Sequence, residues 1–202
     1  MSSCENSPVK TVDQAVAPSL FSQIRNWAHK AEYESVFSPY DEIEYPDLVV
    51  EIPIWIHICL RTAIAECMGA DYSGIYIHTQ FARLTTESTP PGPHGAHNDA
   101  IHGEYSAFFY INDAPDDVAA GTSLLTHKKT GLNSQPTRVE EWEAWQRDTS
   151  NYDAWNIDEM VVWEPNRLSV YPAARMHRAE PVGGWGKDAT DGRLVLITFF
   201  ST

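Results

Sequence analysis

Three residues whose side chains bind metal ions stand out in this sequence. His97 and Asp99 are separated by one residue, and on an extended strand residues two positions apart point to the same face. His177 lies 78 residues beyond Asp99 and offers a second imidazole. Two histidines and one carboxylate form the facial ligand set that leaves open positions on Fe(II), which suits oxygen chemistry. The pattern predicts a metal site, although this spacing also arises by chance in a chain with 8 His and 28 acidic residues.

An arginine follows His177 after 16 residues. Arg193 begins an apolar stretch in which Val195, Ile197 and Phe199 share its face if the stretch is a strand. A guanidinium in such surroundings is costly unless an anion pairs with it, and its planar fork matches a carboxylate. We therefore expect Arg193 to bind an anionic ligand; the alternative is an arginine that faces water at the edge of a strand.

Two helices are expected to precede the residues that carry the chemistry. Apolar residues recur at spacings of three and four over about 19–33 and about 53–68. Gly69 stands at the position of a C-terminal cap for the second helix. Residues 1–17 are expected to form a flexible tail, and residues 36–51 a loop between the helices.

Short alternating runs take over from Gly74 onward, a pattern typical of strands. The first half of 138–156 resembles a short helix. Two helices followed by about seven strands predict a mainly β fold, a β-sandwich or jelly roll backed by the helices. The strands are expected over 75–81, 105–112, 121–127, 160–163, 167–171 and 193–200.

A series of motifs runs in order through this second part of the chain. They are His97-Asn98-Asp99, YSAFFYIN at 105–112, Gly121-Thr122, PNRLSVYP at 165–172, HRAEPV at 177–182 and GRLVLITFF at 192–200. Over about residues 74–202, these motifs resemble the Fe(II)/2-oxoglutarate-dependent oxygenases, in particular their prolyl-hydroxylase-like branch. The resemblance implies a double-stranded β-helix, jelly-roll or cupin-like, in one domain at 18–202. Its N-terminal helices would occupy 18–69, and about 134–158 would be an insertion.

The resemblance also assigns roles to the residues with which we began. It implies Fe(II) held by His97, Asp99 and His177, with O2 and 2-oxoglutarate as cosubstrates. Arg193, helped by the Tyr110 hydroxyl, would grip the C5 carboxylate of 2-oxoglutarate. Such a dioxygenase oxidises an unactivated C–H bond, by default to a hydroxyl group, and forms succinate and CO2. Halogenating relatives lack the carboxylate ligand, so Asp99 favours oxygen transfer, while desaturation and ring closure stay open.

Further side chains are candidates for contact with the substrate. Tyr76, His78 and Gln80 share one face of a predicted strand and are expected to face the pocket or, alternatively, to pack; Arg83 lies on the opposite face. Trp185 sits among glycines at 183–186, which predicts a mobile lid. His94 is a rival ligand to His97, but no carboxylate follows it two positions on.

The composition narrows the range of possible partners and cellular compartments of the protein. A net charge of −14 disfavours DNA or RNA as a partner. No apolar run approaches the roughly 20 residues of a membrane span, and residues 1–17 lack an apolar signal segment. The 3 cysteines are read as ordinary thiols in a reducing compartment. We expect a cytoplasmic enzyme that acts on a small molecule or an amino acid, with no nucleic-acid or membrane partner.

Two other functions compete with this interpretation. A cupin-like metal-binding protein, such as an isomerase, a sensor or a binding module, needs the same three ligands but gives Arg193 no 2-oxoglutarate to hold. A β-sandwich interaction domain without a metal would leave His97, Asp99 and His177 far apart.

Overall fold

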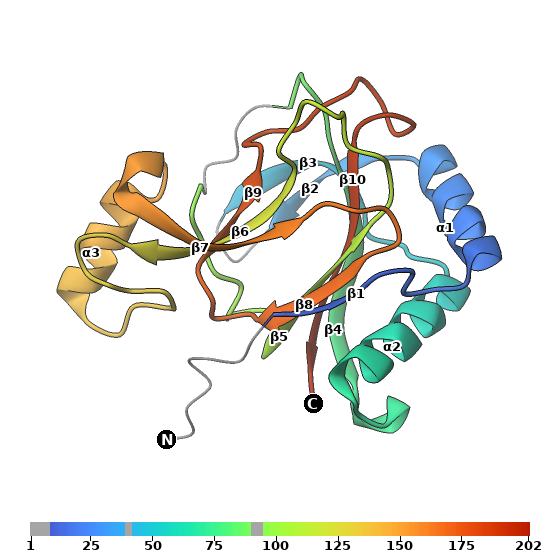
Figure 1. Cartoon of the computed structure of the whole chain (residues 1–202), viewed down its shortest axis with the longest axis horizontal. Coiled ribbons are helices and arrows are strands. Elements are labelled where there is room, and N and C mark those ends of the chain that lie inside the picture. Colours follow the sequence, from blue (N-terminus) through green and yellow to red (C-terminus); the bar gives the residue numbers. More distant parts are fainter. Residues whose placement is uncertain (1–8, 39–41, 90–94) are drawn as a thin grey trace.

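The computed structural model describes residues 9–38, 42–89 and 95–202 (Figure 1). Its helices are α1 (Pro18–Lys30), α2 (Ile54–Met68) and α3 (Val139–Asp148), with short 3-10 turns at Tyr72–Gly74 and Tyr152–Ala154. Its strands are β1 (Lys10–Val12), β2 (Glu34–Ser38), β3 (Ile43–Val49), β4 (Tyr76–Thr85), β5 (Tyr105–Tyr110), β6 (Gly121–His127), β7 (Trp155–Val162), β8 (Leu168–Pro172), β9 (His177–Glu180) and β10 (Arg193–Ser201).

The strands form two antiparallel sheets. The larger sheet has the order β1-β8-β5-β10-β4-β3-β2, and the smaller has the order β7-β6-β9. Side chains of both sheets meet in one core, which joins Phe108 and Ile197 of the larger sheet to Leu124 and Val161 of the smaller. Two facing sheets whose strands cross between them in sequence are a double-stranded β-helix, so the predicted mainly β fold is confirmed.

The outer face of the larger sheet is covered by α1 and α2, as predicted (Figure 1). Because successive strand residues point to opposite faces, Leu194 and Leu196 of β10 pack against Ile24 of α1 and Ile56 of α2. The residues between them in β10 face the smaller sheet. The same alternation therefore builds the helix-facing core and the inner face on which the site lies.

Several local predictions agree with the structure. β6 spans the residues expected of it, and both N-terminal helices form within a few residues of their predicted bounds. Gly69 ends α2 in the left-handed conformation, with φ of 68°; its N–H donates to the Glu66 carbonyl, and the Ala70 N–H donates to that of Ala65. None of the described helices is long and apolar enough to cross a membrane.

The loop predicted over 36–51 is wrong. β2 and β3 pair with each other there, and β3 adds to the edge of the larger sheet through Leu48 opposite Arg83. Pro46 and Asp47 interrupt the local strand pattern, and Asp47 has a positive φ of 57°. The pairing with distant β4 stabilises this segment, and such pairing leaves little mark on the local sequence.

The flexible tail predicted over 1–17 is also only partly correct. β1 pairs with β8 at the opposite edge of the larger sheet, with Thr11 opposite Ser169. Val16 is buried and is held by two hydrogen bonds between its backbone and the Asn166 side chain. These contacts fix 10–16 to the sheet, while residues 1–8 lie outside the described ranges.

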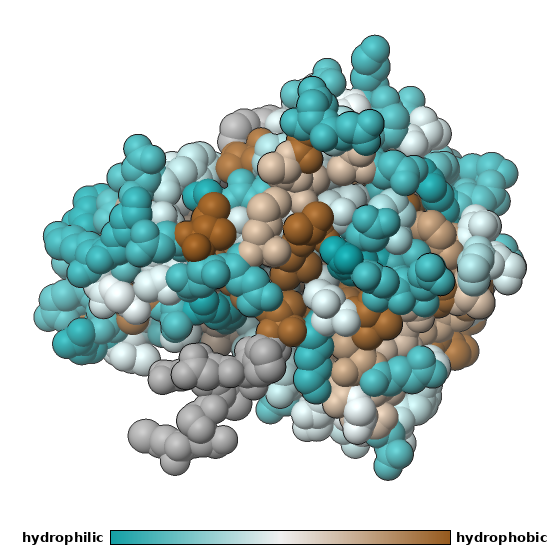
Figure 2. Space-filling view, in the orientation of Figure 1, coloured by the Kyte–Doolittle hydropathy of each residue, from teal (hydrophilic) through white to brown (hydrophobic). Residues whose placement is uncertain are grey.

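α3 belongs to the segment predicted as an insertion, which stays a prediction. This segment projects from the barrel at the end near β7 (Figure 1), and hydrophilic residues cover that end (Figure 2). It is attached through a small apolar cluster of Ala96, Leu125, Trp155 and Met176. The Trp155 indole N–H also donates to the Asp148 carbonyl at 2.9 Å.

Candidate metal centre and adjoining cavity

The backbone brings the predicted metal ligands together. His97 and His177 form an antiparallel bridge, in which each N–H donates to the other's carbonyl at 3.0 and 2.8 Å. The Asp99 N–H donates to the Ala173 carbonyl at 2.7 Å. Main-chain hydrogen bonds therefore hold His97 and Asp99 beside His177, although a long stretch of chain separates them.

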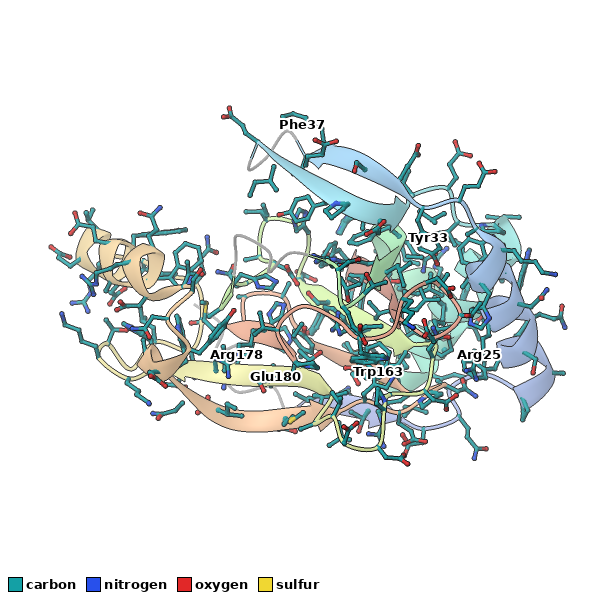
Figure 3. The ribbon with its side chains drawn as sticks, turned by 90° about the horizontal axis from the view of Figure 1, so that it is seen from above. Arg25, Tyr33, Phe37, Trp163, Arg178 and Glu180 are labelled. Atoms are coloured by element: carbon teal, nitrogen blue, oxygen red, sulfur yellow. The ribbon has the colours of Figure 1, made fainter. Side chains whose placement is uncertain are left out.

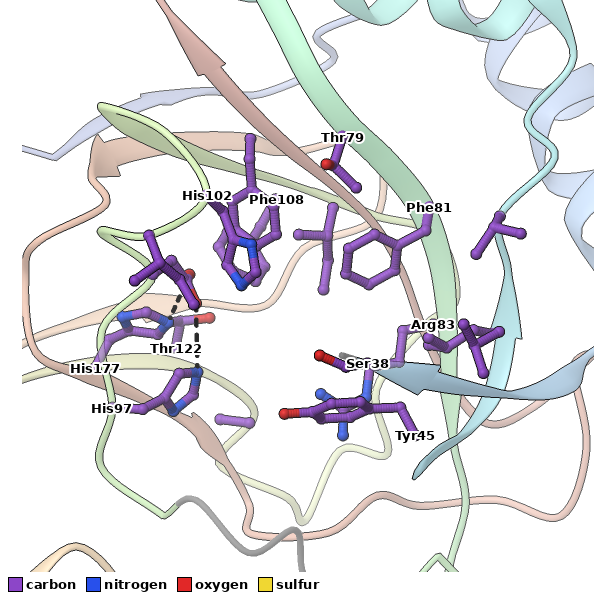
Figure 4. A pocket seen from close by; sticks show the side chains of 18 of the residues that line it. Ser38, Tyr45, Thr79, Phe81, Arg83, His97, His102, Phe108, Thr122 and His177 are labelled. Atoms are coloured by element: carbon purple, nitrogen blue, oxygen red, sulfur yellow. Dashed lines mark ion pairs between the residues drawn. The ribbon is translucent and has the colours of Figure 1, made fainter. Parts of the chain in front are cut away.

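The three predicted ligands converge in the structure. One ligand atom from each of His97, Asp99 and His177 lies within 4.8 Å of the others. Nε2 of His177 lies 3.3 Å from one carboxylate oxygen of Asp99, and Nε2 of His97 lies 3.8 Å from the other (Figure 4). The metal-free β-sandwich alternative required these residues to be far apart, so the geometry contradicts it.

Hydrogen bonds around the ligands orient their donor atoms. Nδ1 of His97 lies 3.2 Å from the Gly95 carbonyl, and Nδ1 of His177 lies 2.9 Å from the Arg175 carbonyl. A carbonyl only accepts, so each Nδ1 carries the proton and each Nε2 is left for a metal. Nε2 of His177 is buried without a hydrogen-bond partner. An orphaned nitrogen of this kind, aimed at a carboxylate, fits a metal ion.

The charges of the site favour a bound cation. Burial opposes ionisation of Asp99, but His177, His97 and the Ser106 hydroxyl outweigh it and hold the Asp99 pKa well below its usual value. Burial likewise opposes protonation of His177, and the Asp99 carboxylate outweighs it, so the His177 pKa is raised. Ser106 donates to Asp99 at 3.0 Å. Asp99 is thus an anion, and a proton or a metal ion on His177 balances it.

Arg193 lies at the start of β10 and is only 5% exposed. Its Nε makes no hydrogen bond, and no carboxylate within the described residues forms an ion pair with it. The guanidinium instead lies 5.3 Å from the centre of the Trp163 ring. Burial, and then the nearby charge of Arg83, lower the Arg193 pKa to about 10. A buried cation without a counter-charge supports the predicted anionic ligand.

Buried hydroxyl groups surround Arg193 and the metal ligands. Tyr171 has a buried hydroxyl without a partner, and its ring packs edge-on against His177 at 5.1 Å. The Thr85 hydroxyl is also buried without a partner among the described residues, and the Ser169 hydroxyl lies close to that of Tyr110. None of these residues lines the cavity, so their hydroxyls lie behind its wall. Tyr171 was not predicted as a site residue, although it lies within the motif at 165–172.

Tyr110 takes a less direct position than the resemblance implies. It is fully buried, stacks on Trp163 at 4.3 Å, and does not line the cavity. Its hydroxyl lies 3.2 Å from the Thr122 hydroxyl, and Thr122 does line the cavity. Thr122 therefore separates the Tyr110 hydroxyl from the cavity, and the contact of Tyr110 with 2-oxoglutarate stays a prediction.

A cavity of about 350 Å³ joins the metal ligands to Arg193. The close view places His97 and His177 on one side, and Tyr45 and Arg83 on the other (Figure 4). The view from above shows the β2–β3 pair, marked by Phe37, standing across from β9 (Figure 3). The remaining lining residues are mostly apolar or aromatic: Val36, Leu48, Val50, Phe81, Ile101, His102, Phe108, Ala179, Ile197 and Phe199, with Ser38, Thr79 and Asp99.

Of the two alternatives for Tyr76, His78 and Gln80 of β4, the structure contradicts the one in which they face the pocket. Tyr76 is 62% exposed, His78 bonds the Ser201 hydroxyl at 2.8 Å, and Gln80 donates to Thr198 at 2.9 Å; none of the three lines the cavity. Their neighbours Phe81 and Arg83 line it instead. A register shift in the β4–β10 pairing between Phe199 and Phe200 interrupts the alternation near His78. The rival ligand His94 lies outside the described residues.

The mobile lid predicted at Trp185 is also wrong. Trp185 is 4% exposed and packs edge-on against Trp163, with ring centres 5.0 Å apart. Gly184 lies so close to Thr85 that a Cβ would collide with its backbone. The glycines therefore allow close packing rather than movement, and Trp185 supports the Trp163 ring that lies beside Arg193.

Comparisons with known proteins agree with this architecture. No protein-family model and no curated protein matches the chain. The α-ketoglutarate-dependent epimerase SnoN from nogalamycin biosynthesis matches with a TM-score of 0.58 and 13% identity, over 96% of this chain and 78% of SnoN. These two chains share a fold. At this identity, the likeness concerns the fold alone.

Two further solved structures match in the same way. HygX from Streptomyces hygroscopicus, solved with nickel, 2-oxoglutarate and hygromycin B, has a TM-score of 0.56 at 13% identity, over 96% of this chain and 82% of HygX. An oxidoreductase of the 2OG-Fe(II) oxygenase family from Burkholderia pseudomallei has a TM-score of 0.53 at 14% identity, over 96% of this chain and 84% of its own. All three neighbours share the double-stranded β-helix.

Proposed function

We propose that this protein is an Fe(II)- and 2-oxoglutarate-dependent dioxygenase that oxidises a C–H bond of a small molecule or an amino acid. The proposal is carried by one cavity that contains two features. One is the cluster of His97, Asp99 and His177, and the other is the buried Arg193, which forms no ion pair among the described residues. Solved structures of the same fold support it, because they contain iron or nickel together with 2-oxoglutarate.

The donor set fits Fe(II). Two imidazole nitrogens and one carboxylate on one side of a metal leave several coordination positions open, which is the ligand set of non-haem Fe(II) oxygenases. When bound, Fe(II) and 2-oxoglutarate together supply the activation of O2, and 2-oxoglutarate is converted to succinate and CO2. Asp99 would fill the position that a halide needs in the halogenating relatives, which favours oxygen transfer.

The chain's own residues have distinct tasks in this proposal. His97 and His177 present neutral Nε2 atoms, because the carbonyls of Gly95 and Arg175 hold the protons on Nδ1. Arg193 neutralises the C5 carboxylate of 2-oxoglutarate, and the Tyr110 hydroxyl, through that of Thr122 at the cavity wall, would add a hydrogen bond. Phe108, Phe199 and their apolar neighbours exclude water from the reacting C–H bond.

The outcome after cleavage of the C–H bond is the finer part of the proposal. We expect hydroxylation by default, with desaturation and ring closure as alternatives. SnoN is described as an epimerase and HygX was solved with hygromycin B, so related folds include proteins that act on or bind small molecules. Membership of the prolyl-hydroxylase-like branch stays a prediction that only the sequence motifs support.

Turnover of 2-oxoglutarate tests the proposal. Purified protein with Fe(II), 2-oxoglutarate, ascorbate and O2 should form succinate slowly even without its substrate. His177→Ala, which removes one ligand, should form none above the level of free Fe(II). If wild type and His177→Ala release equal amounts of succinate although wild type binds Fe(II), the cupin-like alternative without 2-oxoglutarate turnover is favoured instead.

A further inference from the structure

A second arginine lines the cavity beside Arg193. Arg83 of β4 lies opposite Val195 of β10, and Arg193 lies opposite Thr85. Directly opposed residues in an antiparallel pair point to the same face, so Arg83 and Arg193 are diagonal neighbours on the inner face of the sheet. Both side chains line the cavity.

Arg83 forms no ion pair among the described residues, and the charges of Asp99 and Asp47 act on its pKa only at longer range. Its Nε is buried without a hydrogen bond, and no carboxylate within 9–38, 42–89 and 95–202 forms an ion pair with its guanidinium. The guanidinium instead lies near the Tyr45 ring, whose centre is 5.7 Å away. Burial lowers the Arg83 pKa, and the Arg83 charge in turn lowers that of Arg193. The two cations thus repel each other in one cavity.

One anion does not balance two such cations. In the proposed function, the C5 carboxylate of 2-oxoglutarate neutralises Arg193, which leaves the charge on Arg83. Arg83 lies across the cavity from His97 and His177, where Tyr45 covers it (Figure 4). A group bound to Arg83 would therefore place the rest of its molecule between Arg83 and the metal ligands, which is the position that a substrate needs.

The other walls of the cavity indicate the chemical character of the rest of a bound molecule. Phe81, Ile197 and Phe199 line the interior, and the cavity also includes the exposed apolar side chains of Phe37 and Ile101, which are 61% and 66% exposed. Exposed apolar side chains gathered at a cavity are typical of a ligand-binding surface. The walls therefore favour an apolar body.

We propose that Arg83 binds a carboxylate group of the substrate and that the substrate is a small organic acid with an apolar body. The inference rests on the proposed function, in which Arg193 is taken by 2-oxoglutarate. A single guanidinium matches the single charge and planar shape of a carboxylate, whereas a phosphate would require further donors. Asp99 is the one carboxylate among the described lining residues and is a predicted metal ligand, so an amino acid's ammonium group would lack a partner.

Matched pairs of ligands test the inference without turnover. The probes are aryl- and alkyl-carboxylates, each with its own primary amide, added to protein loaded with Fe(II) and 2-oxoglutarate under anaerobic conditions. Binding is measured by calorimetry. Wild type should bind the acids about tenfold or more tightly than the amides, because a charged hydrogen-bonded pair is lost in the amide.

Two variants and a control complete the test. Arg83→Gln should remove the preference for acids while its 2-oxoglutarate affinity stays within about twofold of wild type. Arg83→Lys, which keeps the charge without the fork, should keep part of the preference even if Arg83→Gln is poorly folded. Arg147→Gln, an exposed arginine of α3 outside the cavity, should behave as wild type.

The outcomes separate the two proposals. Equal affinity of wild type for acids and amides, or no binding of either, overturns the inference. It is also overturned if Arg83→Gln keeps the preference, or weakens 2-oxoglutarate as strongly as Arg193→Gln does, since Arg83 would then serve the cosubstrate. If wild type fails to bind 2-oxoglutarate at all, the proposed function has failed, and this inference fails with it.

Discussion

At the scale of single residues, the site combines an anion that needs a cation with a cation that needs an anion. Asp99 is buried and ionised between two imidazoles, while Arg193 is buried without a counter-charge among the residues that the structure describes. Each is costly alone, because a buried charge is tolerated only when it is paired. A metal ion and a carboxylate cosubstrate would satisfy both at once.

Arg193→Gln should separate metal binding from cosubstrate binding. The variant keeps all three metal ligands, so Fe(II) affinity should stay unchanged. The loss of a charged hydrogen-bonded pair should weaken 2-oxoglutarate by about 10- to 100-fold. Equilibrium dialysis with each ligand measures both values. Unchanged affinity for 2-oxoglutarate would show that the carboxylate anchor lies elsewhere.

The metal-free protein should lose stability as the pH rises past neutrality. The His177 pKa is raised in the folded protein, so its contribution is full below the unfolded value of about 6.5 and is lost above the folded value. The Asp99 pKa is lowered, so the contribution of Asp99 to stability is present at neutral pH and is lost only in strong acid. Thermal melts from about pH 6 to about pH 9 should show the fall in wild type.

His177→Gln is the control for this pH dependence, because it cannot titrate. Its melting temperature should lack the fall assigned to His177. Added Zn(II) should stabilise wild type more as the pH rises, since protons and metal compete for the same nitrogen. A wild-type profile identical to that of His177→Gln would contradict the assigned coupling of His177 to Asp99.

At the scale of elements, strands were predicted well where their residues alternate regularly and poorly where the alternation is broken. β6 and β10 alternate clearly, and sequence alone placed them. β2 and β3 were missed because Pro46 and Asp47 break the pattern within β3, the strand that joins this pair to β4 of the larger sheet. The missed β2–β3 pair carries Tyr45 and so forms a wall of the cavity.

The segment at 183–186 shows why glycine content alone misleads. Glycines serve both flexible and tightly packed backbone, and only the tertiary structure distinguishes the two. Here Gly184 lies against Thr85, and Trp185 fills the space beside Trp163. The same sequence that suggested a lid therefore supports the Trp163 ring, which lies beside Arg193.

Trp185→Ala should test this support. Loss of a buried tryptophan should lower the free energy of unfolding by about 3–5 kcal/mol and weaken 2-oxoglutarate through the loosened Trp163 ring. Chemical denaturation and ligand titration measure the two effects. Trp55→Ala, at the exposed start of α2, should change stability by less than about 1 kcal/mol. A stability equal to wild type for Trp185→Ala would restore the mobile lid.

At the scale of the whole molecule, the fold explains how distant ligands meet. The two facing sheets bring His97 and Asp99 beside His177, and the end of β4 beside the start of β10. His97 and Asp99 could be predicted because their spacing is local, whereas His177, 78 residues further on, was assigned through the order of the motifs. The second arginine of the cavity could not be predicted, because its role depends on the register between β4 and β10 and on the bulge near His78.

The charge of the cavity differs in sign from the net charge of the chain. The chain carries a net charge of −14, whereas the cavity gathers two arginines with a single carboxylate among its described lining residues. The cavity is thus positively charged within an acidic protein. Such a contrast favours small anions over polyanions, because a polyanion would meet the acidic surface before it reached the arginines.

The most direct test of the central claim is an anaerobic titration of the metal-free protein with Fe(II) and 2-oxoglutarate. Chelation of protein-bound Fe(II) by 2-oxoglutarate gives a weak visible charge-transfer band. We predict a saturable band of one Fe(II) and one 2-oxoglutarate per chain, weakened in Arg193→Gln and absent in His177→Ala. If wild type binds Fe(II) but gives no band at saturating 2-oxoglutarate, the proposed oxygenase function is wrong.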